Sequence, residues 1–108
     1  MSVTPVVLNV GGVKFYTTFR TLTGPSSGQN SYFSNLDYTK GEIFIDRDPT
    51  VFKYILNHLR DGSVLFPNDA FTRALVYQEA KFYRLRILIE KIEAARKAEM
   101  MRQAPKKA

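Results

Sequence analysis

The sequence contains no cysteine and no tryptophan, and His58 is its single histidine. Without cysteine, the chain can form neither a disulfide framework nor a thiolate metal site. It also lacks the run of roughly 18 apolar residues that a membrane-spanning helix needs. Residues 1–10 lack the basic start, apolar stretch and cleavage site of a secretory signal. These absences predict a cytoplasmic protein without a membrane span.

Basic residues are scarce in the first part of the chain and concentrated at its end. The net charge is +6 at pH 7, and residues 1–80 carry seven basic and seven acidic side chains. Residues 81–108 carry nine basic and three acidic side chains, so they supply the whole excess. Nucleic-acid-binding domains place such charge on a folded reading surface with motif residues, which this sequence lacks. We therefore expect no nucleic-acid partner and interpret the basic end as a solvated helix, with an acidic partner or a membrane surface as the alternative.

Motifs of catalysis are absent as well. The sequence has no phosphate-binding loop, nucleophile elbow, dinucleotide fingerprint or cluster of metal ligands. His58 has no positioned nucleophile beside it, and it lies off the apolar stripe of its predicted helix, so we expect an exposed side chain. The sequence thus predicts that the chain is not an enzyme, with no catalytic residues, no metal site and no cofactor.

The strands that are present follow one strong local pattern. Two β-branched runs, residues 6–10 and 13–18, are separated only by Gly11-Gly12. Glycine accepts the positive φ of a tight turn, so this spacing predicts a hairpin. Residues 21–30 are rich in Ser, Thr and Gly and are expected to form mostly a loop, and residues 41–46 a third strand.

Helices are expected mainly in the second half of the chain, which predicts a mixed α/β domain. Ser31 is expected to start a short helix, and Asp48-Pro49 fits the cap and first residue of another that ends at Gly62. An extended piece over residues 64–66 follows. Asn68 is expected to cap the next helix, and residues 85–97 to form the last one. The stripe of that next helix consists of Phe71, Ala74, Leu75 and Gln78.

Four motifs in this order resemble the potassium-channel tetramerisation branch of the BTB/POZ fold. They are Leu8-Asn9-Val10-Gly11-Gly12 with Phe15, Phe44-Ile45-Asp46-Arg47-Asp48-Pro49, Phe52-x-x-Ile55-Leu56-Asn57-x-Leu59-Arg60-x-Gly62, and Glu79-Ala80-Lys81-Phe82-Tyr83. The match runs from about Val6 to Ile92 and is most similar to the soluble KCTD-type proteins. It implies a small three-stranded mixed sheet flanked by a cluster of helices. We expect the domain to span residues 1–97 and a basic, disordered tail to span residues 98–108.

The resemblance also implies a function, namely self-association into a homo-tetramer or homo-pentamer. Some members act as substrate adaptors of a cullin-3 E3 ubiquitin ligase, which is our first hypothesis. The alternative is the tetramerisation domain of a voltage-gated potassium channel subunit. The family usually has a longer apolar helix where residues 24–30 form a short glycine-rich stretch here, so the resemblance does not describe the surface around that stretch.

Two groups of residues are expected to form the contact surfaces that the resemblance implies. The first is an oligomer interface, in which the guanidinium of Arg47 binds carboxylates of the neighbouring subunit. The alternative is that Asp48 only caps a helix and Arg47 lies in water. The second is a cullin surface, although Asn35 stands where adaptors commonly have Glu. The alternative is that Phe33 belongs to the core and Asn35 and Tyr38 only lie at the surface. The interface group is Asn9, Phe44, Asp46, Arg47 and Asp48, and the cullin group is Phe33, Asn35 and Tyr38.

Overall fold

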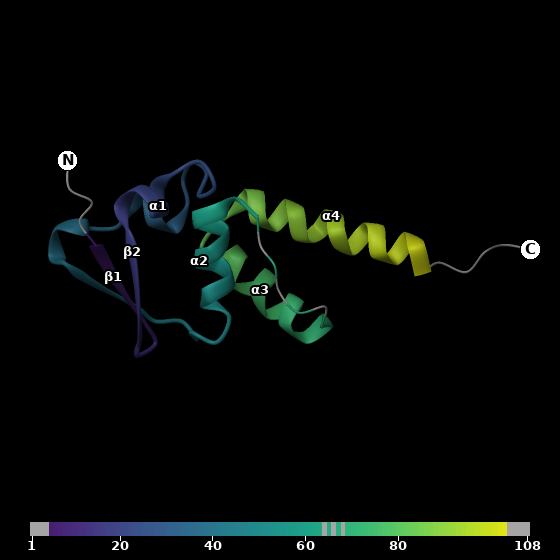
Figure 1. The fold of residues 1–108 in the computed structure, drawn as a ribbon, viewed down its shortest axis with the longest axis horizontal. Coiled ribbons are helices and arrows are strands. Elements are labelled where there is room, and N and C mark those ends of the chain that lie inside the picture. Colours follow the sequence, from purple (N-terminus) through teal and green to yellow (C-terminus); the bar gives the residue numbers. More distant parts are fainter. Residues whose placement is uncertain (1–4, 64, 66, 68, 104–108) are drawn as a thin grey trace, which may run out of the picture.

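The computed structural model describes residues 5–63, 65, 67 and 69–103. Figure 1 shows the sheet at one end of the molecule, α2 in the middle, and α3 and α4 at the other end. In chain order the elements are β1 (Pro5–Val10), β2 (Val13–Thr18), α1 (Phe19–Thr23), the 3₁₀ helices η1 (Tyr32–Asn35) and η2 (Tyr38–Lys40), β3 (Glu42–Ile45), α2 (Phe52–Asp61), α3 (Ala70–Phe82) and α4 (Arg86–Gln103).

The sheet is three-stranded and mixed, with the order β2-β1-β3. β1 pairs antiparallel with β2 through the predicted hairpin, whose Gly11 and Gly12 both have positive φ. β1 also pairs in parallel with β3. Leu8 of β1 stands opposite Phe15 and Ile43, so these three side chains share the inner face of the sheet. The predicted fold class is confirmed.

The core is built on α2, which lies between the sheet and α3 (Figure 1). Phe15 contacts Phe52 of α2, with 4.8 Å between the ring centroids. Tyr83, which follows α3, stacks on Phe33 of η1 at 5.1 Å and meets Phe52 at 5.5 Å. Burial of each large apolar side chain contributes about 1.5–3 kcal/mol. Aromatic packing thus fixes the sheet, η1 and α3 around one helix.

The start of α2 differs from the sequence-based expectation by about one turn. Asp48 does not cap the helix: its Oδ1 accepts a hydrogen bond of 2.7 Å from Thr50 N and closes a separate turn. Phe52 N donates to Pro49 O within this turn, and the helix begins only at Phe52. Gly62, with φ of 76°, ends the helix as predicted.

The orientation of α3 was not evident from the sequence. Asp69 caps this helix by accepting hydrogen bonds from Phe71 N and Thr72 N, while the expected cap Asn68 and positions 64 and 66 of the expected extended piece lie outside the described residues. Val76 and Ala80 face the core and are fully buried. The stripe that begins at Phe71, which is 71% exposed, therefore lies on the outer side.

α4 is longer than expected and continues to Gln103. Its first turns are held by the buried Leu88 and Ile92, whereas its side chains are mostly exposed from Ala94 onward. Figure 1 shows this second half projecting away from the rest of the chain. Residues 98–103 are therefore helical, which corrects the expected end of the last helix at residue 97 and the expected disorder of these six residues; residues 104–108 lie outside the described part.

Candidate interaction surfaces

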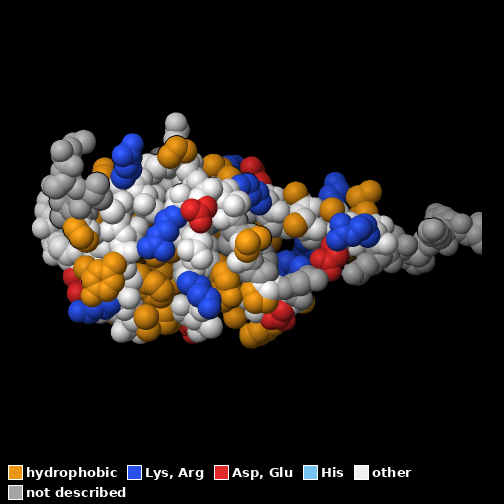
Figure 2. Space-filling model, in the orientation of Figure 1, with side chains coloured by type: hydrophobic (Ala, Val, Ile, Leu, Met, Phe, Trp, Pro, Cys, Tyr) orange, Lys and Arg blue, Asp and Glu red, His pale blue; other side chains and the backbone are white. Residues whose placement is uncertain are grey.

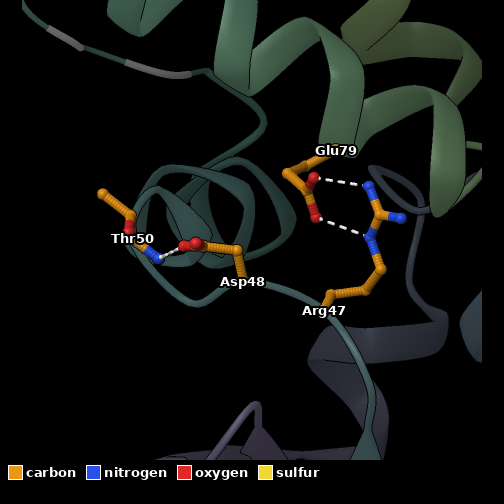
Figure 3. Close-up of polar contacts among 4 residues, drawn as sticks. All are labelled: Arg47, Asp48, Thr50 and Glu79. Atoms are coloured by element: carbon orange, nitrogen blue, oxygen red, sulfur yellow. Dashed lines mark hydrogen bonds and ion pairs between the residues drawn. The ribbon is translucent and has the colours of Figure 1, made fainter.

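Arg47 lies after β3 and forms an ion pair with Glu79 of α3 in the same chain (Figure 3). Its Nε and Nη2 donate to Glu79 Oε1 and Oε2 at 3.0 and 2.6 Å, and its guanidinium lies 4.3 Å from the centroid of the Phe82 ring. These hydrogen bonds raise the pKa of Arg47 above its already high value. The guanidinium of Arg47, which was expected to bind a neighbouring subunit, thus binds a carboxylate of its own subunit. Its partner is 32 positions away, and no local sequence signal pairs the two.

The two aspartates beside Arg47 take different positions. Asp46 is exposed, directly after β3. Asp48 is also exposed, and the hydrogen bonds from Thr50 hold the pKa of its carboxyl below the usual range (Figure 3). Both carboxylates are therefore accessible on the segment that joins β3 to α2.

The outer sheet face carries exposed aromatic side chains around a polar centre. We define this face by Asn9, Lys14, Tyr16, Glu42 and Phe44, which alternate with the core-facing residues of the three strands. Tyr16 and Phe44 are each 62% exposed.

Asn9 organises the polar centre of the outer sheet face. Its Oδ1 accepts from Gly12 N at 2.8 Å, and its Nδ2 donates to Glu42 Oε2 at 3.2 Å. Lys14 pairs with the same carboxylate at 3.2 Å, and these two donors lower the pKa of Glu42. Asn9 therefore links the hairpin turn to the Glu42 side chain of β3 within its own subunit.

A second apolar surface lies on the outer side of α3, beyond α2 from the sheet. A hollow of about 320 Å³, called here the α3 hollow, separates α3 from the start of α2. Its lining includes Asp48, Thr50, Phe71, Leu75 and Gln78. Sequence reasoning recognised the stripe of α3 but gave no sign that it faces outward. Asp48, predicted at an interface, therefore lies at a different surface from Asn9 and Phe44.

The residues expected to bind a cullin are only partly accessible. Phe33 is fully buried in the aromatic core, so its side chain cannot contact a partner in this fold, which corrects that expectation. Asn35 is exposed. Tyr38 is half-buried and donates from its hydroxyl to Phe33 O at 2.6 Å, and burial raises its pKa to about 12. Tyr38 also meets Phe19, which is 54% exposed, at 5.0 Å between ring centroids.

His58 is fully buried, so the expectation of an exposed histidine was wrong. The loop after α1 covers this side of α2: His58 Nε2 donates to Ser26 O at 3.0 Å, because a carbonyl can only accept. Nδ1 then carries no hydrogen and finds no partner among the described residues. Burial lowers the pKa of His58, and the nearby positive charge of Lys91 acts in the same direction. The histidine is a neutral structural residue.

Within the described part of the chain, no group of three or more potential ligand side chains is placed to hold a metal ion. The same residues include no helix with the length and hydropathy to cross a membrane. The described residues form three surfaces: the outer sheet face, the α3 hollow, and a strip around Asn35 that also includes Phe19 and the half-buried Tyr38.

A small mixed sheet with helices around α2, together with several exposed surfaces, is an arrangement that suits an interaction domain. Residues 6–92 match the BTB/POZ domain family, and the chain belongs to this family of protein-interaction domains. It is 43% identical over 94 residues to the BTB/POZ domain-containing protein KCTD21 of Homo sapiens and, equally, of Mus musculus. The alignment covers 82% of this chain and 36% of each relative, so the chain spans about a third of their length. The resemblance predicted from the four motifs is confirmed.

Proposed function

We propose that this domain assembles with copies of itself into a closed ring, a tetramer or a pentamer. In this proposal it serves in the cytoplasm as a substrate adaptor of a cullin-3 E3 ubiquitin ligase. The observation that carries the assembly is the presence of exposed aromatic side chains on two unlike surfaces: Tyr16 and Phe44 on the outer sheet face, and Phe71 at the α3 hollow.

Two unlike surfaces on opposite sides of a subunit fit a head-to-tail contact. Such a contact buries one surface of a subunit against the other surface of its neighbour, and it closes into a ring when the rotation permits. Phe44 and Tyr16 of one copy supply large side chains. The α3 hollow of the next copy, beside the exposed Phe71, supplies the recess. We expect each subunit to bury on the order of 800 Å² in such a contact.

The predicted interface residues divide between these two surfaces. Asn9 and Phe44 belong to the outer sheet face, and Asp48 belongs to the rim of the α3 hollow. Asp46 lies on the segment between them and stays in the proposal as an exposed contact. We propose that Arg47 acts indirectly: its pair with Glu79 holds the β3–α2 segment against α3 and so shapes the α3 hollow.

A mixing experiment tests the head-to-tail contact. Phe44→Asp damages only the outer sheet face, and Phe71→Asp damages only the rim of the α3 hollow. Both side chains are more than half exposed, so we expect each variant to fold. Native mass spectrometry should show each variant alone as a monomer. An equimolar mixture should form a one-to-one heterodimer, because each variant keeps the surface that the other needs.

The controls separate this contact from other forms of assembly. Val13→Asp changes a residue that is 47% exposed, on β2 at the hairpin and outside both surfaces as defined here, and it should leave the ring intact. If Phe44→Asp gives monomers while Phe71→Asp keeps the full ring, the outer sheet face meets a surface other than the α3 hollow, and the proposed head-to-tail pairing is refuted. A monomeric unaltered domain at micromolar concentration would remove the assembly altogether.

The cullin contact is assigned to the exposed strip formed by Phe19, Asn35 and Tyr38. The strip combines an exposed aromatic ring with a polar side chain on a short 3₁₀ helix. Calorimetric titration with a cullin-3 N-terminal fragment should give binding that Asn35→Arg abolishes. The absence of heat at roughly tens of micromolar, a weak affinity for a specific complex, would remove the ligase part.

The channel alternative rests on the same fold. Both relatives at 43% identity are described as KCTD-type proteins and not as channel subunits. This similarity supports the adaptor over the channel subunit. A pentameric mass would exclude the channel assembly, whereas a tetrameric mass fits both.

A further inference from the structure

A further surface, separate from the two assembly surfaces and from the strip around Asn35, lies where the loop after α1 meets the start of α4. It is a groove of about 800 Å³. Its walls are residues 28–30 on one side and α4 on the other, with the link from α3 to α4 at one end. Figure 1 shows the loop after α1 reaching the first turns of α4. The loop belongs to the stretch, residues 24–30, that was expected to depart from the family pattern.

The link end of the groove carries three positive charges within six positions, at Lys81, Arg84 and Arg86. All three side chains are exposed, and none of them forms an ion pair with another described residue. Neighbouring cations without counter-charges raise the local positive potential and attract acidic groups.

The remaining lining makes the groove directional. Ile87, which is 37% exposed, and the partly buried Ile89 form an apolar floor. Glu90 and Glu93 lie further along α4, and Glu93 accepts a hydrogen bond of 2.6 Å from the Tyr77 hydroxyl. The positive charge is thus at one end of the groove and the negative charge at the other.

Two strained residues hold the cationic end in place. Asn30 and Arg84 have φ of 62° and 54°, and they are the non-glycine residues with positive φ in the described part of the chain. Both line this groove, and Arg84 Nε donates to Asn30 O at 3.1 Å. Such conformations are costly for residues other than glycine and concentrate at functional sites. The wall is therefore fixed before any partner arrives.

We propose that this groove binds an acidic, partly apolar segment of a partner protein. The acidic residues of the segment contact Lys81, Arg84 and Arg86, and an apolar side chain packs on Ile87. The two glutamates at the far end repel a uniformly acidic chain and so set the direction of binding. The site does not depend on self-assembly, because it shares no residue with the outer sheet face or with the α3 hollow.

Selection from a randomised dodecapeptide library displayed on phage tests the proposal. The domain serves as bait, and the affinity of the selected peptides is then measured by fluorescence anisotropy. We expect enrichment of sequences with several Asp or Glu residues next to an aliphatic or aromatic residue. Their affinity should fall with rising salt, because exposed charges are screened.

A charge-reversal pair locates the site. Lys81→Glu with Arg86→Glu should weaken the peptides by about tenfold or more, since two attractions become repulsions. Arg86 is the first residue of α4, where an acidic residue suits the helix end, so we expect the fold to persist. The matched control is Lys53→Glu with Arg20→Glu, which changes the net charge equally. Lys53 lies over the Tyr54 ring at 5.2 Å, much as Lys81 lies over Tyr77 at 5.1 Å.

Four results would overturn the proposal. They are selected peptides without acidic enrichment, equal weakening by the two variant pairs, and loss of the oligomer in the Lys81/Arg86 variant. The fourth is binding to phosphatidylserine-containing vesicles that needs Lys81 and Arg86 in the absence of peptide binding. A monomeric domain would refute the ring but leave this groove testable, so the two proposals fail separately.

Discussion

The pair of Arg47 and Glu79 gives the sharpest test of how this fold is held together. Replacing Arg47 with Met keeps an apolar, flexible side chain on the Phe82 ring but leaves Glu79 without its guanidinium partner. The Glu79 side chain is only 7% exposed, so water cannot fully replace the lost hydrogen bonds. We expect Arg47→Met to lower the free energy of unfolding.

The size of the loss follows from burial. Removing one partner of a buried ion pair costs about 3–5 kcal/mol. Because the Arg47 side chain is 27% exposed, we expect the lower end, about 3 kcal/mol. Replacing both partners, as Arg47→Met with Glu79→Leu, removes the stranded charge and should cost about 1 kcal/mol or less. The coupling between the two positions is then at least about 2 kcal/mol, to which any cost of Glu79→Leu alone is added.

Urea unfolding followed by far-UV circular dichroism measures these values, with all variants at one protein concentration because assembly contributes to stability. Lys14→Met is the control. Because Lys14 lies on the outer sheet face, all variants are also compared in the Phe44→Asp background, in which assembly is expected to be lost. Lys14→Met removes the cation of an exposed pair, with side chains 52% and 43% exposed, and should change the stability little. A loss below about 1 kcal/mol for Arg47→Met, the range of a surface pair, would refute this reasoning. So would a double variant that is the plain sum of the single ones.

Three further predictions concern single residues. The pKa of His58 is lowered below the ordinary 6.5. The contribution of His58 to the free energy of unfolding should therefore be full above pH 6.5 and fall as the pH drops below it, because the unfolded chain then binds a proton that the folded chain does not. Urea midpoints at several pH values should show this fall, and His58→Gln should flatten the profile. Gly11→Ala should lower the melting temperature more than Gly12→Ala, since both residues need positive φ but only the Gly11 Cβ would lie 2.4 Å from Arg47 O; equal losses would contradict this. Asp69→Ala should lower the helical circular dichroism signal and the melting temperature more than Asp69→Asn, which keeps an acceptor for the first turn of α3.

Local chemistry allowed much of the fold to be predicted. Gly11-Gly12 between two β-branched runs specified the hairpin, and Gly62 specified the end of α2, because each depends on the backbone freedom of a few adjacent residues. Asp48 misled because an aspartate before a proline suits both a helix cap and an isolated turn. Only the three-dimensional structure shows that Thr50 takes its carboxylate and that the helix starts at Phe52.

The surfaces were harder to predict because they depend on contacts between distant segments. α3 carries apolar residues on two sides, and periodicity cannot tell which side faces the core. The packing of Val76 against the core leaves Phe71 outside. His58 is covered by the loop after α1, and Arg47 finds Glu79 across 32 positions. Each of these relations joins elements that the sequence keeps apart, so no local pattern contains it.

The double variant at Arg47 and Glu79 also decides what Arg47 does in assembly. If Arg47 supports the α3 hollow only from within its subunit, the Met/Leu pair restores the packing and the ring should form with its normal mass. If Arg47 instead contacts a carboxylate of the neighbouring subunit, the double variant should fold but remain monomeric, because that contact needs the charge. The structure favours the first outcome, since both carboxylate oxygens of Glu79 already bind Arg47 at 3.0 and 2.6 Å. Native mass spectrometry of this folded, uncharged variant separates an indirect role from a direct one, which Arg47→Glu alone cannot do because it would place a second carboxylate beside Glu79.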